Sequence, residues 1–263
     1  MKYKYGFIGC GNMGSALARA VCAAGCSVIV SDKSAEKAEA FAAELGCSFG
    51  TNSEVAANCE KIFLAVKPQV IENAVNEAKA ILCESKPLLI TMAAGVEISV
   101  IEKLTEGKLP IIRIMPNTPV SVGKGMVLYC GNSLVTDDMF KDFVYDMRFS
   151  GELDKIEEKL IDAGCALSGC GPAYMYMFAE ALADGAVACG LPRDKAAKYA
   201  AATMAGSAAL LLNSNKNPGA LKDAVCSPGG TTIMGVKALE DGGLRAAAMN
   251  AVIEAFKRNK ELM

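Results

Sequence analysis

The stretch SPGGTT at residues 227–232 contains residue types that can bind a small anion. Two glycines and three hydroxyl side chains stand directly before an amphipathic helical pattern. Consecutive backbone N–H groups at a helix start attract negative charge, so the run from Gly229 to Thr232 suits a single carboxylate. The hydroxyl groups of Thr231 and Thr232 can also donate to a ring nitrogen or accept from it. In a structural interpretation of the same stretch, Ser227 only caps the helix, with a proline in the first turn. The two roles are compatible.

A second glycine-rich stretch, GCGNMG, follows a strand-like run and opens a helical pattern. Its three glycines match the dinucleotide-binding fingerprint, and the next strand-like run, SVIVSD, ends in an acidic residue. Such glycines permit a tight turn and let backbone N–H groups approach a pyrophosphate at the helix start. The predicted cofactor-binding residues of this stretch are Gly9, Gly11, Asn12, Met13 and Gly14.

The residues after the second strand-like run leave the choice of cofactor open. A carboxylate there, Asp32, usually binds the ribose 2′-hydroxyl of NADH and repels a 2′-phosphate. Lys33 and Ser34 follow at once and can accommodate that phosphate, so NADH is slightly favoured and NADPH is not excluded. Asn52 is placed for an adenosine contact, and capping of a helix is its alternative role.

Three further turns are expected at the carboxyl ends of strands, where ligands of such sheets bind. Two are rich in small residues, which let a flat ring lie against the backbone, and the third holds an asparagine in a proline-framed loop. The predicted cofactor-binding residues in these turns are Ala65, Val66, Lys67, Pro68, Ala93, Ala94, Gly95 and Asn117.

A nicotinamide cofactor implies hydride transfer, and the composition restricts the acceptor. Reduction of a carbonyl needs a proton donor, usually His, Lys or Tyr, and the chain contains no histidine. Hydride addition to a protonated cyclic imine gives a neutral amine directly, so that reaction needs positioning more than a strong acid. The missing histidine is consistent with imine reduction.

The order of the elements predicts how these residues are positioned. Short apolar runs alternate with amphipathic helices in the first half, which indicates βαβ units around a parallel sheet. Only helices are expected after about residue 155. We predict an α/β fold: a Rossmann-type doubly wound domain at residues 1–155, followed by an all-α dimerisation domain at 156–263. The alanine-rich helices are apolar nearly all round, so they predict a dimer interlocked through this domain. The alternative is an internal helical hairpin packed on the sheet domain.

Composition excludes several other classes of protein. With a net charge of −2 and no basic run, a nucleic-acid partner has little support. Eleven cysteines, without a C-x-x-C pair or a histidine, predict no metal site and reduced thiols, hence a cytoplasmic protein. The beginning of the chain lacks a signal-peptide pattern and no apolar run is long enough for a membrane span, so no membrane association is expected.

Five segments spread over nearly the whole chain resemble the 1-pyrroline-5-carboxylate reductase family, which makes L-proline. They read FIGCGNMGSAL, AVKPQ, RIMPNTP, LSGCGPAYMYMFAEALADGAVACGLPRDKA and DAVCSPGGTTIMGVKALEDGGLRAA. The resemblance implies NAD(P)H-dependent reduction of 1-pyrroline-5-carboxylate, helices swapped between two subunits, and dimers that often assemble into decamers. Asp32 departs from the family pattern, which puts the usual NADPH preference in doubt.

The resemblance also implies roles for the candidate residues. Thr232 would hydrogen-bond the ring nitrogen as the catalytic residue. The substrate carboxylate would be held by Ser227 and by amides of the glycine-rich stretch, so the substrate-binding residues are Ser227, Gly229, Gly230, Thr231 and Thr232. The turn from Gly9 to Gly14 would hold the pyrophosphate, Asn52 the adenosine end, and the turns at 65–68 and 93–95 the nicotinamide end.

A Rossmann-type domain followed by helices is also compatible with two other functions. A β-hydroxyacid dehydrogenase-like enzyme would need a lysine such as Lys195 or Lys222 in the cleft, and it would leave SPGGTT without a role. A non-catalytic sensor of the nicotinamide cofactor would need no site for a substrate carboxylate.

Overall fold

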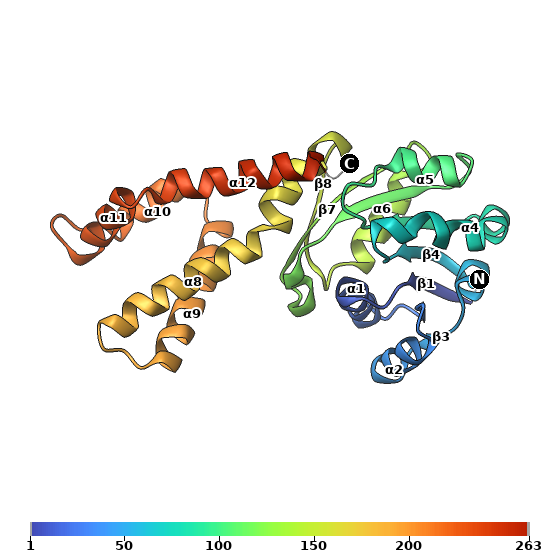
Figure 1. The fold of residues 1–263 in the computed structure, drawn as a ribbon, viewed down its shortest axis with the longest axis horizontal. Helices are drawn as coiled ribbons and strands as arrows, with labels where there is room; N and C mark the ends of the chain where they lie inside the picture. Colours follow the sequence, from blue (N-terminus) through green and yellow to red (C-terminus); the bar gives the residue numbers. More distant parts are fainter. Residues whose placement is uncertain (1, 262–263) are drawn as a thin grey trace. The chain divides into compact units, whose positions relative to one another are not determined.

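A computed structural model describes residues 2–261, and the chain divides into two compact units (Figure 1). The first unit comprises the residues up to 170 together with the segment from 255 onward, and the second comprises residues 171–254. The change from mixed elements to helices alone follows residue 155. The compact units divide after residue 170 and before residue 255. The predicted domain boundary between residues 155 and 156 lies within the first unit and stays a prediction.

The first unit is built on one eight-stranded sheet in the order β3-β2-β1-β4-β5-β6-β7-β8. The order starts in the middle and grows outward in both directions, as in a doubly wound fold. The strands are β1 Tyr3–Ile8, β2 Val28–Ser31, β3 Ser48–Phe49, β4 Cys59–Leu64, β5 Leu88–Thr91, β6 Ile111–Met115, β7 Gly125–Gly131 and β8 Gly151–Lys155.

The sheet is mixed rather than all parallel, because β7 runs antiparallel to β6. Only residues 116–124 connect these two strands, fewer than the dozen or so that a parallel crossover needs. Both edge strands lack a recognisable strand signal in the sequence and were not predicted. β3 has only two residues, and β8, GELDK, is mostly polar, so neither presents an apolar run.

Helices cover both faces of this sheet, and each face has its own apolar core. One core joins α1, α2 and α6 to the strands, and the other joins α3, α4, α5 and α7. The α-helices of the first unit are α1 Asn12–Ala23, α2 Ala35–Leu45, α3 Asn52–Asn58, α4 Pro68–Ser85, α5 Ile98–Leu104, α6 Asp137–Asp146 and α7 Ile161–Gly164. Three short helical segments are Thr118–Val122, Glu158–Leu160 and a π-helix at Cys165–Gly169.

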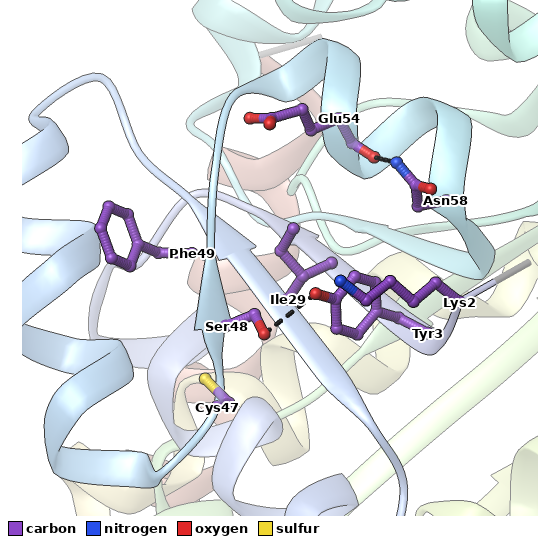
Figure 2. A pocket seen from close by; sticks show the side chains of 8 residues that line it. All are labelled: Lys2, Tyr3, Ile29, Cys47, Ser48, Phe49, Glu54 and Asn58. Atoms are coloured by element: carbon purple, nitrogen blue, oxygen red, sulfur yellow. Dashed lines mark hydrogen bonds between the residues drawn. The ribbon is translucent and has the colours of Figure 1, made fainter.

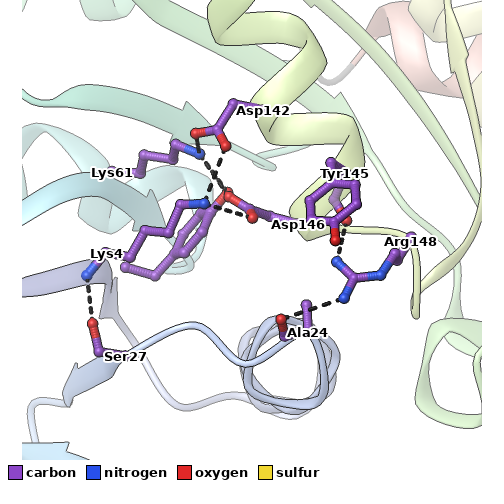
Figure 3. A network of polar contacts seen from close by, with 9 residues as sticks. Lys4, Ala24, Ser27, Lys61, Asp142, Tyr145, Asp146 and Arg148 are labelled. Carbon is purple, nitrogen blue, oxygen red and sulfur yellow. Dashed lines mark hydrogen bonds and ion pairs between the residues drawn. The ribbon is translucent and has the colours of Figure 1, made fainter.

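A charged cluster ties β1 and β4 to α6 (Figure 3). Asp146 is 1% exposed, and its carboxylate lies 2.7 Å from both Lys4 Nζ and Lys61 Nζ. The Tyr5 hydroxyl donates to the same carboxylate at 2.9 Å, and Asp142 pairs with both lysines. Burial alone would raise the pKa of Asp146, but the hydrogen bonds from the two lysines outweigh it and hold that pKa below its usual range.

The second unit contains helices alone, and its core is small. Its helices are α8 Gly171–Ala188, α9 Arg193–Leu212, α10 Pro218–Ala224, α11 Thr231–Asp241 and α12 Leu244–Glu261, the last of which runs on beyond the unit. Only Ala183, Ala196 and Ala200 form a buried apolar cluster within this unit. Large apolar side chains such as Tyr176 and Leu212 are exposed in the single chain.

Candidate active site

The turn between β1 and α1 is shaped by glycines that no other residue replaces easily. Gly9 has φ +108°, and a Cβ built there would lie 2.5 Å from the carbonyl oxygen of Ala65. A Cβ on Gly14 would lie 2.5 Å from the Gly9 oxygen. By contrast, a Cβ on Gly11 would meet nothing within 4 Å. The turn therefore packs tightly against the sheet on one side and is open at Gly11, where a pyrophosphate can approach.

Helix α1 begins at this open point. Gly11 is its N-cap, without a side-chain cap, so the amides of the first turn are available to an anion. Asn12 is exposed, while the side chain of Met13 packs against the apolar core. Met13 can therefore contribute its backbone to a ligand at the helix start, and Asn12 can contribute its side chain.

A cavity of about 700 Å³ opens beside this turn. It is formed by the carboxyl ends of β1, β2 and β4 and by the start of α4. Its lining includes eight of the predicted cofactor-binding residues: Gly9, Gly11, Asp32, Lys33, Asn52, Ala65, Val66 and Lys67. A cavity that combines apolar walls with a few polar and charged side chains, at the edge where parallel strands end and next to an uncapped helix start, fits a dinucleotide.

Asp32 lies in this cavity with its carboxylate already hydrogen-bonded. One oxygen accepts from the Cys10 N–H at 2.7 Å and the other from the Ser34 N–H at 3.2 Å. Burial, with the Asp32 charge adding to it, raises the pKa of the Cys10 thiol to about 11. Cys10 is therefore a protonated thiol at neutral pH.

Asn52 also lies in the cavity, and it does not cap α3. The N-cap is Thr51, which forms a capping box with Glu54, so the alternative role predicted for Asn52 is wrong. The Asn52 amide accepts from Ser31 Oγ at 2.8 Å and donates to Glu77 Oε2 at 3.0 Å. One amide N–H remains for a ligand.

The turn after β4 leads directly into helix α4, as a strand end followed by a helix predicts. Lys67 is the N-cap of α4 and Pro68 is its first residue, which suits the fixed φ of proline. Because the N-terminal amides of α4 face the same strand ends as the glycine turn, both helix starts can contribute to one anion site.

The remaining predicted cofactor residues lie at the neighbouring strand ends and outside the cavity lining. Ala93 is buried and Gly95 follows in the turn after β5. The Asn117 amide accepts from the Met126 N–H at 2.9 Å and donates to the Ser168 carbonyl at 3.0 Å. Asn117 therefore holds the π-helix against β7, and its contact with a cofactor stays a prediction, as do the contacts of Ala93, Ala94 and Gly95.

In the stretch SPGGTT, Ser227 does not cap the following helix, so the structural role predicted for it is wrong. Helix α11 begins at Thr231, its N-cap is Gly230 instead of Ser227, and no side chain within the described chain caps it. Gly229 has φ +65°, and the Gly230 N–H donates to the Ser227 carbonyl at 3.1 Å. The turn therefore leaves an uncapped helix start with both threonines exposed.

The structure adds cavity residues that the sequence analysis missed. Lys37 comes from the first turn of α2, and Asn73 and Glu77 come from one face of α4. The spacing of four between Asn73 and Glu77 was the available signal, because it places both on one side of a helix. A separate hollow at the β3 edge, lined by Tyr3 and Ser48 among others, shares no residue with this cavity (Figure 2).

The described residues form neither a metal-binding cluster nor a membrane-spanning helix. Within residues 2–261, no cluster of three or more potential ligands is arranged to hold a metal ion. No helix of the described chain has both the length and the apolar character needed to cross a bilayer.

The close packing at Gly9 yields a prediction. Gly9→Ala should weaken binding of NADPH and NADH at least tenfold, because the new methyl group collides with backbone and shifts the turn. The measurement is a fluorescence titration of each cofactor. Gly25→Ala is the matched control, since Gly25 has φ +85° but open space around its Cβ. Wild-type affinity in Gly9→Ala would contradict the assignment of this turn.

Comparison with known proteins identifies relatives of the whole chain. Residues 158–262 match a family model described as pyrroline-5-carboxylate reductase dimerisation, and residues 4–95 match one described as NADP oxidoreductase, coenzyme F420-dependent. A pyrroline-5-carboxylate reductase of Arabidopsis thaliana is 41% identical over 99% of this chain and 95% of its own. One of Escherichia coli is 39% identical over 100% of this chain and 99% of its own.

Solved structures agree with these matches. A pyrroline-5-carboxylate reductase of Coxiella burnetii superposes with a TM-score of 0.90 at 34% identity, covering 100% of this chain and 99% of that one. A Plasmodium falciparum pyrroline carboxylate reductase with NADP bound gives a TM-score of 0.87 at 34% identity, over 98% and 97% of the two chains. The fold class predicted from the sequence is confirmed, and the chain belongs to the pyrroline-5-carboxylate reductase family.

Proposed function

We propose that this protein reduces 1-pyrroline-5-carboxylate to L-proline, with NADPH or NADH as the hydride donor. The observation that carries the proposal is the similarity to pyrroline-5-carboxylate reductases over essentially the whole chain, at 39–41% identity. The cavity beside the glycine turn and the uncapped start of α11 supply the two binding sites that this reaction requires.

The glycine turn and the cavity are the proposed cofactor site. The amides from Gly9 to Gly14 hold the pyrophosphate, and the free N–H of Asn52 contacts the adenosine end. The turns at 65–68 and 93–95, with Asn117 beside them, hold the nicotinamide end. When bound, the reduced nicotinamide supplies the hydride.

The start of α11 is the proposed substrate site. Its unpaired amides, with the Ser227 hydroxyl, bind the single carboxylate of the substrate. Gly229 and Gly230 leave the approach to these amides open. The Thr232 hydroxyl hydrogen-bonds the ring nitrogen, which orients the imine carbon and stabilises the amine as it forms. The imine is already protonated when it accepts the hydride, so the reaction needs no histidine as a proton donor.

The chain forms a homo-oligomer, since residues 158–262 match a dimerisation family. We propose that the dimer interlocks through α8 to α12. The small core of the second unit and the exposure of Tyr176, Leu210 and Leu212 support this arrangement, because a partner's helices would bury that apolar surface. Assembly of dimers into a decamer is proposed on the family resemblance.

We place the protein in the cytoplasm, free of membrane and of nucleic acid. All eleven cysteines are free thiols, and thiols in this number persist in a reducing compartment.

The experiment that tests the function measures initial rates on 1-pyrroline-5-carboxylate with NADH and NADPH side by side. We expect turnover with at least one of them and none with β-hydroxy acids. Absence of turnover with both cofactors would overturn the proposal, and turnover only with a β-hydroxy acid would favour the dehydrogenase alternative.

The substrate site yields a second prediction. Gly230→Val should raise KM for the substrate about tenfold, because a Cβ at Gly230 would lie 2.3 Å from Ser227 Oγ and displace the hydroxyl that is proposed to bind the carboxylate. KM for the cofactor, measured on the same variant, is the control and should stay within twofold. A cofactor KM that rises as much as the substrate KM would show that the variant disturbs more than the anion site.

A further inference from the structure

The carboxylate of Asp32 already forms hydrogen bonds within the protein. Its two oxygens accept from the backbone N–H groups of Cys10 and Ser34, and the side chain is 16% exposed. These bonds fix the glycine turn to the loop after β2. Each oxygen keeps one further lone pair, but the two backbone bonds leave the carboxylate little freedom to turn toward the 2′- and 3′-hydroxyl groups of a ribose. Asp32 is therefore poorly placed to decide the cofactor by ribose binding.

Lys37 changes the electrostatic role of Asp32. Its Nζ lies 3.7 Å from Asp32 Oδ2, and its side chain is 53% exposed and lines the cavity. The backbone N–H of Lys37 is held by the Ser34 cap at 3.3 Å, so its Cα is fixed while its amine can move. The amine can keep Asp32 neutralised and reach an anion in the cavity.

The charges of the whole cavity support an anion there. Its charged lining residues are Asp32, Lys33, Lys37, Lys67 and Glu77. The two acids have partners within the protein, Glu77 through Asn52 and Asp32 through the amides and Lys37. Helix α2, with eleven residues, begins two residues after Lys33, so the positive end of its dipole lies close to this part of the cavity lining.

We propose that Lys37, rather than Asp32, sets the preference of this protein between NADPH and NADH. The inference rests on the proposed function, which makes a nicotinamide dinucleotide the cofactor. Lys37 binds the 2′-phosphate of NADPH together with Lys33, and it also cancels the repulsion from Asp32. Without Lys37, Asp32 repels the 2′-phosphate, whereas NADH carries no group there and is nearly unaffected.

The test compares binding and kinetics in Lys37→Gln and Asp32→Asn. The affinity for NADP⁺ and NAD⁺ is measured by calorimetry without substrate, and KM for NADPH and NADH in the reductase assay. Lys37→Gln should weaken NADP⁺ at least tenfold and change NAD⁺ less than threefold. Adding Asp32→Asn to Lys37→Gln should recover part of the NADP⁺ affinity, because it removes the repelling charge.

The matched control is Lys141→Gln, since Lys141 is an exposed lysine of α6 paired only with Asp138 at 3.1 Å. It should change neither affinity. Lys37→Gln with unchanged NADP⁺ affinity would overturn the inference. A tenfold loss of NAD⁺ affinity in Asp32→Asn, with little effect of Lys37→Gln on NADP⁺, would assign the choice to Asp32 instead.

The calorimetric readout separates this inference from the proposed function. Absence of turnover by the wild-type protein would refute the reductase activity, while the NADP⁺ and NAD⁺ affinities would still decide the role of Lys37. The salt dependence adds a further check, because screening should weaken NADP⁺ binding more in the wild type than in Lys37→Gln.

Discussion

Thr232→Ala should lower kcat on 1-pyrroline-5-carboxylate by about 10²-fold, the size of effect seen when one hydrogen bond to a reacting centre is removed. The hydroxyl of Thr232 is exposed at an uncapped helix start, where it can hydrogen-bond the ring nitrogen. Alanine keeps the helix and its amides but removes that bond. Steady-state kinetics with saturating cofactor measures the change.

Two comparisons make this result specific. Thr232→Ser keeps a hydroxyl and should recover most of the lost activity, whereas a purely structural role of the methyl group predicts that it recovers none. The affinity for NADPH should stay within twofold in both variants. A kcat/KM of Thr232→Ala equal to that of the wild type would show that the Thr232 hydroxyl does not bind the ring nitrogen of the substrate.

Asp146→Asn should destabilise the first unit by about 3 kcal/mol, the low end of the usual cost of removing one partner from a buried ion pair, because Asp142 still pairs with both lysines. The substitution leaves the buried Lys61 amine without its nearest buried counter-charge and weakens the bond from Tyr5. The urea midpoint at neutral pH measures the loss. Asp138→Asn, a 92% exposed carboxylate of the same helix, is the control and should change the midpoint little.

The same carboxylate makes stability depend on pH. Its pKa lies below the usual value in the folded protein, so the stabilisation is complete above the pKa of the unfolded chain, about 4. It is lost as the pH falls through the lower pKa of the folded state. Wild-type stability should therefore fall below about pH 4, and Asp146→Asn should show a shallower fall in that range. Parallel profiles would contradict this account.

Sequence patterns predicted the elements that carry a strong local signal. The turn from Gly9 to Gly14 combines three glycines with a strand before and a helix after, and each of these features is local. The strands β1, β2, β4, β5, β6 and β7 each contain an apolar run. The polar edge strand β8 has no such signal, because pairing with β7 alone makes it a strand.

Contacts between distant segments could not be predicted in this way. Arg113 lies in an apolar strand, and its burial depends on Glu158 and Asp162, which come from a segment more than forty residues later. Lys37 gave no signal among the exposed charges of α2, since only the folded chain brings its amine to Asp32. Asn117 was assigned to the cofactor by position, while the structure also gives it partners at Met126 and Ser168.

The small core of the second unit links folding to the amount of protein present. Three buried alanines bury too little surface to offset the entropy of ordering residues 171–254 in one chain. In the proposed interlocked dimer, a newly made chain would complete this unit only when it meets another, so the fraction of folded protein should rise with concentration. Two chains interlocked in this way would exchange partners only by unfolding, so an inactive variant made alongside the wild type would stay trapped in mixed dimers.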